Sequence, residues 1–203
     1  FCSDIGTLNR LHNKFEFIEL ANSLGIPTPE TIRVESVAEI QENITPKHIL
    51  KPVYSRFGEH VIMEPDPDRL NIDVSQATPW ILQERLVGKQ YCLQGICRDG
   101  KVLSSVAYSS DFTVSKSSVF FENTDKGDLG GIIENIASSC NYTGFLSFDV
   151  MLCEDGTVRP IECNPRATSA LHLYATNDRI DEAILNGQSI GCTGSARRLV
   201  LPM

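Results

Sequence analysis

The sequence lacks the features that define several large classes of protein. It has no apolar run of about 18 residues, so we expect no membrane-spanning segment. Its start has no charged stretch followed by an apolar core, as a signal peptide would have. Basic residues are scattered: the longest basic cluster is the pair Arg197-Arg198, and the net charge is −8. Because nucleic-acid phosphates are held by clustered lysine and arginine, we expect neither a nucleic acid nor a membrane as a partner.

A zinc site of the common cysteine type is also missing. The seven cysteines are scattered, their number is odd, and no pair has C-x-x-C spacing. Cys92 and Cys153 lie in apolar runs, where a reduced thiol behaves as a small hydrophobic side chain. We therefore expect free thiols in a reducing cytoplasm. The chain begins at Phe1 and not at methionine, so we expect a fragment or a processed product.

The composition is that of a soluble globular protein. Hydrophobic residues make up 41% and charged residues 22% of the 203 positions, enough for one or two compact domains with a core. Capping residues and apolar spacing predict helices over 13–23, 36–44, 128–139 and 178–185. Apolar runs and turn signals predict strands over 48–53, 61–63, 80–86, 90–97, 101–108, 145–153 and 157–163. Hairpins are expected around Arg98-Asp99-Gly100 and Glu154-Asp155-Gly156. This mixture predicts an α+β protein built on antiparallel sheets.

The second hairpin is expected to gather polar side chains. If its turn is centred near residues 155–156, Asp149 and Glu162 face each other on neighbouring strands. Asn164 is two residues beyond Glu162 and projects to the same face. Two carboxylates and an amide oxygen form the hard, all-oxygen set that Mg²⁺ takes when phosphates complete its shell. Arg166, two residues further on, can neutralise an anion beside that metal.

The competing interpretation is a hairpin with an exposed acidic face, since surface carboxylates are common. The residues beside the two carboxylates are apolar, however: Phe148, Val150, Ile161 and Cys163. A strand pair of this composition is expected to be well buried, and carboxylates in such a place need a partner. The set as a whole favours a metal site.

These residues also resemble a known family. Asp149 followed, after a glycine-containing turn, by Glu162-x-Asn164-x-Arg166 resembles the metal signature of the ATP-grasp superfamily. Other landmarks of that family occur in the same order: Asn13-Lys14 before Leu24-Gly25-Ile26-Pro27-Thr28-Pro29, Lys51-Pro52 before Ser55-Arg56-Phe57-Gly58, and Gln83-Glu84-Arg85-Leu86-Val87-Gly88. The resemblance extends from about Lys14 to about Leu173.

The resemblance implies a nucleotide site. Lys14 and Lys51 stand where the family has lysines that bind phosphate. The segment containing Gln83, Glu84 and Leu86 resembles the hinge strand, whose backbone pairs with adenine. The cofactor implied is therefore ATP. A further residue, Gln90, stands where members often carry a glutamate that holds the ribose hydroxyls.

It implies a metal and a catalytic set as well. Asp149, Glu162 and Asn164 would bind Mg²⁺, or Mn²⁺ in its place. Ser147 stands where some ligases of the family have an arginine that stabilises the transferring phosphoryl group. If nothing else replaces that arginine, Arg166 or Arg56 must supply the charge.

The fold implied is the ATP-grasp fold, in which two α+β lobes with antiparallel sheets clasp the nucleotide. A leading helix within 1–25 would pack on the larger lobe. The smaller lobe would span 26–83, and the larger lobe, with the metal site, 84–190. Residues 191–203 resemble no part of the family. The α/β domain that usually precedes this region, and often contributes to the acceptor site and to oligomers, is missing.

The activity implied is ligation. MgATP would phosphorylate a small carboxylate substrate, and an amine or a similar nucleophile would displace phosphate from the acyl phosphate. Segments 145–149 and 164–173 resemble carbamoyl-phosphate-synthetase-like ligases more than D-alanine ligases. One alternative is an ATP-binding regulatory module or subunit without its own ligase activity. Another is a metal-dependent hydrolase unrelated to ATP, which leaves the lysines and the hinge unexplained.

Overall fold

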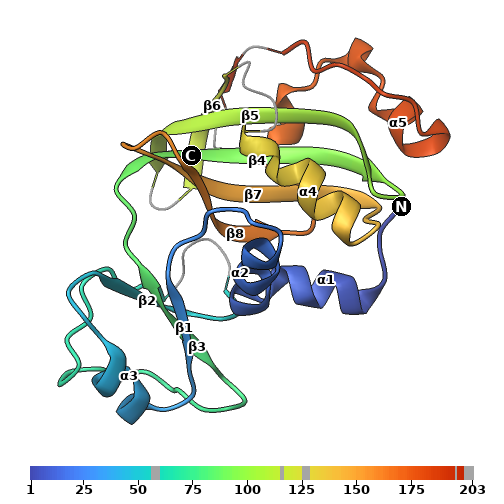
Figure 1. The fold of residues 1–203 in the computed structure, drawn as a ribbon. Coiled ribbons are helices and arrows are strands. Elements are labelled where there is room, and N and C mark those ends of the chain that lie inside the picture. Colours follow the sequence, from blue (N-terminus) through green and yellow to red (C-terminus); the bar gives the residue numbers. More distant parts are fainter. Residues whose placement is uncertain (56–59, 115–116, 125–128, 195, 199–203) are drawn as a thin grey trace.

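The computed structural model describes residues 1–55, 60–114, 117–124, 129–194 and 196–198, and it contains two separate antiparallel sheets (Figure 1). The smaller sheet has the strand order β1-β3-β2. Its strands are β1 (Thr31–Val34), β2 (His48–Pro52) and β3 (Trp80–Glu84). Helix α3 (Val37–Asn43) places Ile40 in a core with Val34, Leu50, Trp80 and Leu82.

The larger sheet has the strand order β8-β7-β4-β5-β6-β9. Its strands are β4 (Gly88–Arg98), β5 (Lys101–Val114), β6 (Ser117–Asn123), β7 (Gly144–Cys153), β8 (Val158–Asn164) and β9 (Ala196–Arg198). Both predicted hairpins are present, because β4 pairs with β5 and β7 pairs with β8 in antiparallel register. The order leaves β8 at an open edge of the sheet.

Three helices cover one face of the larger sheet (Figure 1). They are α1 (Ile5–His12), α2 (Lys14–Ser23) and α4 (Ile132–Ser139). Their apolar side chains, such as Leu11, Phe17 and Ile136, share a core with Leu93 and Phe148 of the sheet. The opposite face packs against a 3₁₀ segment (Ser169–Leu173), a second one (Thr176–Asp178) and helix α5 (Ile180–Asn186).

Several predicted helix ends are confirmed by their caps. Asn13 accepts hydrogen bonds from the N–H groups of Phe15 and Glu16, and Ser36 accepts one from Glu39. These side chains satisfy N–H groups that the first turn of a helix leaves without a partner. The last helix ends, as predicted, at Gly187, whose φ of 69° suits glycine.

Other predicted elements were wrong or incomplete. The strand expected over 61–63 is a single bridge between Leu50 and Ile62. The helix expected from Asp128 begins at Ile132, after a 3₁₀ turn (Leu129–Gly131) in which two glycines have positive φ; Asp128 itself lies outside the described residues. Helix α1 and strands β1, β6 and β9 were not predicted.

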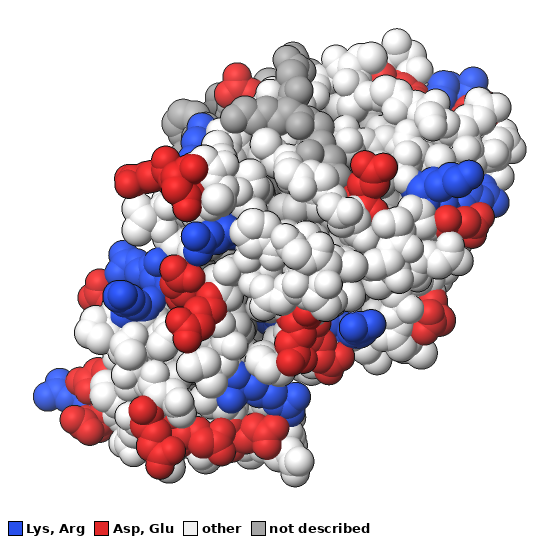
Figure 2. Space-filling model, viewed as in Figure 1, with Lys and Arg blue, Asp and Glu red and all other residues white. Residues whose placement is uncertain are grey.

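The surface carries both signs of charge. On the face drawn in Figure 2, lysine and arginine alternate with aspartate and glutamate and do not gather into one basic patch. Within the described part of the chain, no helix combines the length and the apolar character that crossing a membrane requires.

Candidate functional site

The hairpin of β7 and β8 has the predicted register at the two carboxylates, with Asp149 opposite Glu162. A bulge follows at once: Val150 pairs with Pro160, so Ile161 has no partner on β7. Proline has no N–H to donate to a ladder, and this one stands on an edge strand beside the bulge. The bulge therefore leaves the carbonyl of Ile161 available on the open edge.

The predicted metal ligands lie together. The Asn164 amide donates to Glu162 Oε1 at 3.1 Å and lies 3.5 Å from Asp149 Oδ2. Arg166 Nη2 donates to Asn164 Oδ1 at 3.1 Å. Burial, with the nearby charge of Glu162, raises the pKa of Asp149 to about 6. The raised pKa means that the surrounding positive charge does not fully stabilise the ionised carboxylate. Asp149 and Glu162 together are therefore suited to bind a cation.

The described residues offer fewer side-chain ligands here than a metal bound by protein alone would need. The described residues contain no cluster of three or more His, Cys, Asp and Glu side chains suited to a metal. Here the two carboxylates suit a hard cation such as Mg²⁺, which keeps waters and phosphate oxygens in its shell. The Asn164 amide turns its nitrogen toward the carboxylates and its oxygen toward Arg166, so it would have to rotate to offer oxygen to the cation.

Two buried lysines approach the same carboxylates. Lys14, the first residue of α2, is 1% exposed; its Nζ lies 3.4 Å from Glu162 Oε2 and donates to Ser55 Oγ at 3.1 Å. Lys51 of β2 is 4% exposed, and its Nζ donates to the Ile161 carbonyl at 3.1 Å. Burial lowers the pKa of Lys51 to about 8, and the charge of Lys14 adds to this while Glu162 opposes it. Helix α2, the small sheet and the edge strand thus meet at one cluster of charges.

Strand β3, which contains the predicted hinge residue Gln83, carries a buried acceptor on the same face of the small sheet as Lys51. By register, Gln83 shares a face of the small sheet with Lys51. Its amide nitrogen donates to Thr31 Oγ1 at 3.1 Å, while the Thr31 hydroxyl donates to the Pro29 carbonyl. These bonds set the orientation of the amide. Gln83 Oε1 is left buried without a hydrogen-bond partner among the described residues, which is costly unless a ligand donates to it.

The family model for the ATP-grasp domain matches residues 11–170. The chain belongs to the ATP-grasp family. Its fold is accordingly the α+β ATP-grasp fold that the sequence predicts. No curated protein matches the sequence.

Solved structures share this fold at low sequence identity. A phosphoribosylamine–glycine ligase from Thermotoga maritima superposes with a TM-score of 0.75 at 14% identity, over 96% of this chain and 59% of that one. An N5-carboxyaminoimidazole synthase from Aspergillus clavatus, solved in complex with ADP, gives 0.70 and 15%, over 93% and 56%. An L-amino acid ligase from Bacillus licheniformis gives 0.63 and 19%, over 85% and 45%. This ATP-grasp chain thus spans about half the length of these three proteins.

The remaining predicted residues of this ATP-grasp chain have different surroundings. Gln90 is exposed on β4, on the same face of the sheet as Asp149. Leu86 is half-buried between β3 and β4, and its N–H donates to no described residue. The carboxylate of Glu84 turns away to the N–H of Glu30 and to Arg159. Arg56 lies outside the described residues.

Sequence reasoning missed Cys92. It pairs with Asp149 across β4 and β7, and its Sγ donates to Asp149 Oδ1 at 2.8 Å. Burial, with the charge of Asp149, raises the pKa of the Cys92 thiol, so it remains a hydrogen-bond donor. Its position two residues after Gln90 was a signal that the two share a face. The pairing of β4 with β7 is not visible in the sequence.

Gln94 was also missed. Its Oε1 accepts from the N–H and the hydroxyl of Thr168, both at 2.9 Å. Ser147 Oγ lies 3.1 Å from the Arg166 carbonyl and 3.3 Å from Gln94 Oε1, and its one hydrogen can be donated to either oxygen. Ser147 therefore contacts the loop that carries Arg166.

Proposed function

We propose that this chain is the nucleotide-binding part of an ATP-dependent ligase that activates a small carboxylate and joins it to an amine or a similar nucleophile. The observation that carries the proposal is the meeting of Lys14, Lys51, Asp149 and Glu162 at the edge of β8, in a chain of the ATP-grasp family. The family membership supports the class of reaction, and the cluster supports its location at this edge.

The balance of charge supports a triphosphate bound with a metal. The two ammonium groups and the two carboxylates cancel in number, so the cluster alone offers no net attraction to a polyanion. A divalent cation on Asp149, Glu162 and Asn164 would tip the balance to positive, and Arg166 would add to it. Lys14 would then be free to turn from Glu162 to phosphate oxygen, since the metal neutralises its present partner.

The hinge supports adenine as the base. Gln83 Oε1 needs a donor, and the exocyclic amino group of adenine is one. The N–H of Leu86 donates to no described residue and could donate to a ring nitrogen of adenine, which is an acceptor. Ile49 lies beside Gln83 on the same face of the small sheet and provides an apolar wall.

The proposed reaction is a phosphoryl transfer followed by an acyl transfer. A carboxylate oxygen of the substrate attacks the γ-phosphorus, the bond to the β-phosphate oxygen breaks, and ADP and an acyl phosphate form. The nucleophile then attacks the acyl carbon and phosphate leaves with the electron pair. Mg²⁺ or Mn²⁺, when bound, would neutralise charge on the phosphates. Of the chain's own groups, Lys14 and Lys51 would bind phosphate oxygens and Arg166 would orient the acceptor or the γ-phosphoryl group; Arg56 is a second candidate for that charge.

A second candidate is an ATP-binding module without ligase activity of its own. The observation in its favour is coverage: the chain spans 45–59% of the length of the three solved structures. The two candidates share the nucleotide site and differ only in turnover.

The test is a calorimetric titration of ATP into the chain, with and without Mg²⁺. Saturable binding is expected, weakened at least tenfold by Lys51→Ala, since a close charge pair in a dry cleft is worth on the order of a few kcal/mol. Glu162→Gln should blunt the dependence on Mg²⁺. Matched controls are Lys101→Ala and Glu154→Gln, which change exposed residues of the same types and should bind as the parent does.

Two outcomes decide between the candidates. ADP release that depends on an added carboxylate and amine supports the ligase, whereas binding without turnover supports the module. A folded chain that binds no ATP contradicts both.

A further inference from the structure

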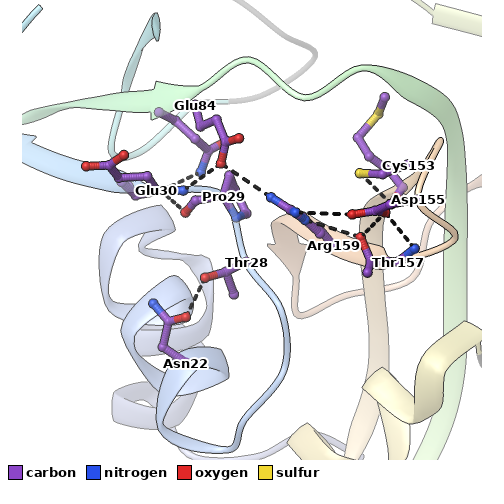
Figure 3. Close-up of polar contacts among 12 residues, drawn as sticks. Asn22, Thr28, Pro29, Glu30, Glu84, Cys153, Asp155, Thr157 and Arg159 are labelled. Atoms are coloured by element: carbon purple, nitrogen blue, oxygen red, sulfur yellow. Dashed lines mark hydrogen bonds and ion pairs between the residues drawn. The ribbon is translucent and has the colours of Figure 1, made fainter. Parts of the chain in front are cut away.

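The two sheets are joined by an ion pair at the end of the hinge strand. Arg159 Nη1 of β8 lies 3.5 Å from Glu84 Oε2 of β3, and Figure 3 shows the two side chains pointing toward each other. The same carboxylate oxygen accepts from the N–H of Glu30 at 3.2 Å. Glu84 therefore links three segments: the hinge strand, the start of β1 and the edge strand of the larger sheet.

Arg159 is itself held by its own hairpin. Its Nε donates to Thr157 Oγ1 at 3.3 Å, and its Nη2 lies 3.6 Å from Asp155 Oδ2 (Figure 3). Thr157 in turn donates its N–H and its hydroxyl to Asp155 Oδ1. The guanidinium is thus aimed before it meets Glu84, which lowers the entropy lost in forming the pair.

Glu84, the acidic residue of this pair, lies in the segment that we propose binds the adenine base. The backbone N–H of Glu84 donates to the Glu30 carbonyl at 2.8 Å, and that of Arg85 to the Lys47 carbonyl at 2.7 Å. These two hydrogen bonds fix the backbone of residues 84–85 to the segments that lead into β1 and β2. Among the described residues, the Arg159 side chain connects this segment to β8, two residues before Ile161, whose carbonyl accepts from Lys51.

We propose that Arg159 is a positioning residue for nucleotide binding: acting through Glu84, it sets the adenine-binding end of the hinge against the edge strand that carries Glu162. This inference rests on the proposed function. Arg159 would affect the binding of the adenine base, whereas Lys14, Lys51 and the carboxylates would affect the binding of the phosphates.

The competing interpretation is an incidental surface ion pair. Arg159 and Glu84 are 25% and 37% exposed, and pairs of this kind contribute little to stability on average. Stability is therefore the wrong measurement. What distinguishes a positioning role is a loss of affinity confined to ligands that carry the base.

The experiment compares MgATP with magnesium tripolyphosphate, the same charged chain without adenosine, in calorimetric titrations. Arg159→Met keeps an unbranched apolar stem and removes the guanidinium group with its charge. It should weaken MgATP about three- to fivefold, the effect of one partly exposed ion pair, and leave tripolyphosphate unchanged. Glu84→Gln can still accept from Glu30 and should give the same pattern. The double variant should be no weaker than either single one, because both remove the same contact.

The matched control is Arg179→Met, which removes an arginine whose ion pairs, among the described residues, are with its neighbours Asp181 and Glu182. This variant should bind both ligands as the parent does. Arg159→Met with parental affinity for MgATP overturns the inference, as does an equal loss for both ligands. If Arg159→Met does not fold, Glu84→Gln decides the question alone. A parent chain that binds no MgATP overturns the proposed function first, so the two failures are distinguishable.

Discussion

At the scale of single residues, Asp149 is a carboxylate whose burial costs free energy of folding when no ligand is bound. Its pKa is raised from 3.8 to about 6 by burial, with the charge of Glu162 adding to the effect, although Cys92 donates to it. Without a bound cation, a buried ionised carboxylate beside another one costs free energy of folding. The residue is therefore better explained by a ligand than by stability.

Replacing Asp149 by asparagine should stabilise the ligand-free protein near neutral pH. A carboxyl with a pKa higher in the folded than in the unfolded chain favours folding at low pH, and this contribution is lost as pH rises through about 4 to 6. Asparagine does not ionise, so Asp149→Asn avoids that loss. The free energy of unfolding of the variant should equal that of the parent near pH 4 and exceed it by on the order of 1–3 kcal/mol at pH 7.5.

Urea unfolding at several pH values measures this difference, and MgATP supplies the second half of the test. The nucleotide should stabilise the parent more than Asp149→Asn, because the variant lacks one metal ligand. A variant that is less stable than the parent at pH 7.5 without ligand would contradict the assignment.

At the scale of elements, the fit between sheet and helix depends on one glycine. Gly95 lies on β4 beneath α4, where an added Cβ would stand 2.5 Å from Ile133 Cγ2 and 3.3 Å from Cys97 Sγ. Ile133 is fully buried and β-branched, so its methyl group has little freedom to move. Close contact between strand and helix here requires the absence of a side chain.

Gly95→Ala should therefore destabilise the fold by about 1–3 kcal/mol, the usual cost of overpacking a core. The control is Gly191→Ala, since an added Cβ there meets no atom within 4 Å. Thermal or urea unfolding of both variants measures the effect. Equal stability of the two would show that α4 shifts away at no cost.

Elements defined by neighbouring residues could be predicted from the sequence. The hairpin turns at 98–100 and 154–156 and the cap at Asn13 depend on a few adjacent positions, and all three are confirmed. Pairings between distant segments could not be predicted: nothing near Cys92 indicates that β4 lies beside β7, or that Arg159 meets Glu84. The proximity of Asp149, Glu162 and Asn164 could be predicted because they share one hairpin, whereas the contact between the sheets was missed because Arg159 and Glu84 do not. That these three residues bind a metal stays a prediction.

At the scale of the whole molecule, the two sheets have cores of very different size. The small sheet buries Val34, Ile40, Leu50, Trp80 and Leu82, while the larger sheet has apolar cores on both faces. A small core provides little hydrophobic stabilisation. The division into lobes at residues 26, 84 and 190 remains a prediction, but this asymmetry has a consequence that can be measured.

The small sheet should unfold before the rest when no nucleotide is bound. Trp80 is the only tryptophan, is 6% exposed and lies in the small core, so its fluorescence reports on that sheet alone. In urea, its transition should come at a lower concentration than the change in far-UV circular dichroism, which reports on both sheets. MgATP, bound between Lys51 of the small sheet and the carboxylates of the larger one, should stabilise the small sheet most and bring the two transitions together. Lys51→Ala should keep them apart at the same nucleotide concentration. Coincident transitions in the ligand-free protein would show instead that the contacts of Lys14, Lys51 and Glu84 with the neighbouring elements already make the two sheets one cooperative unit.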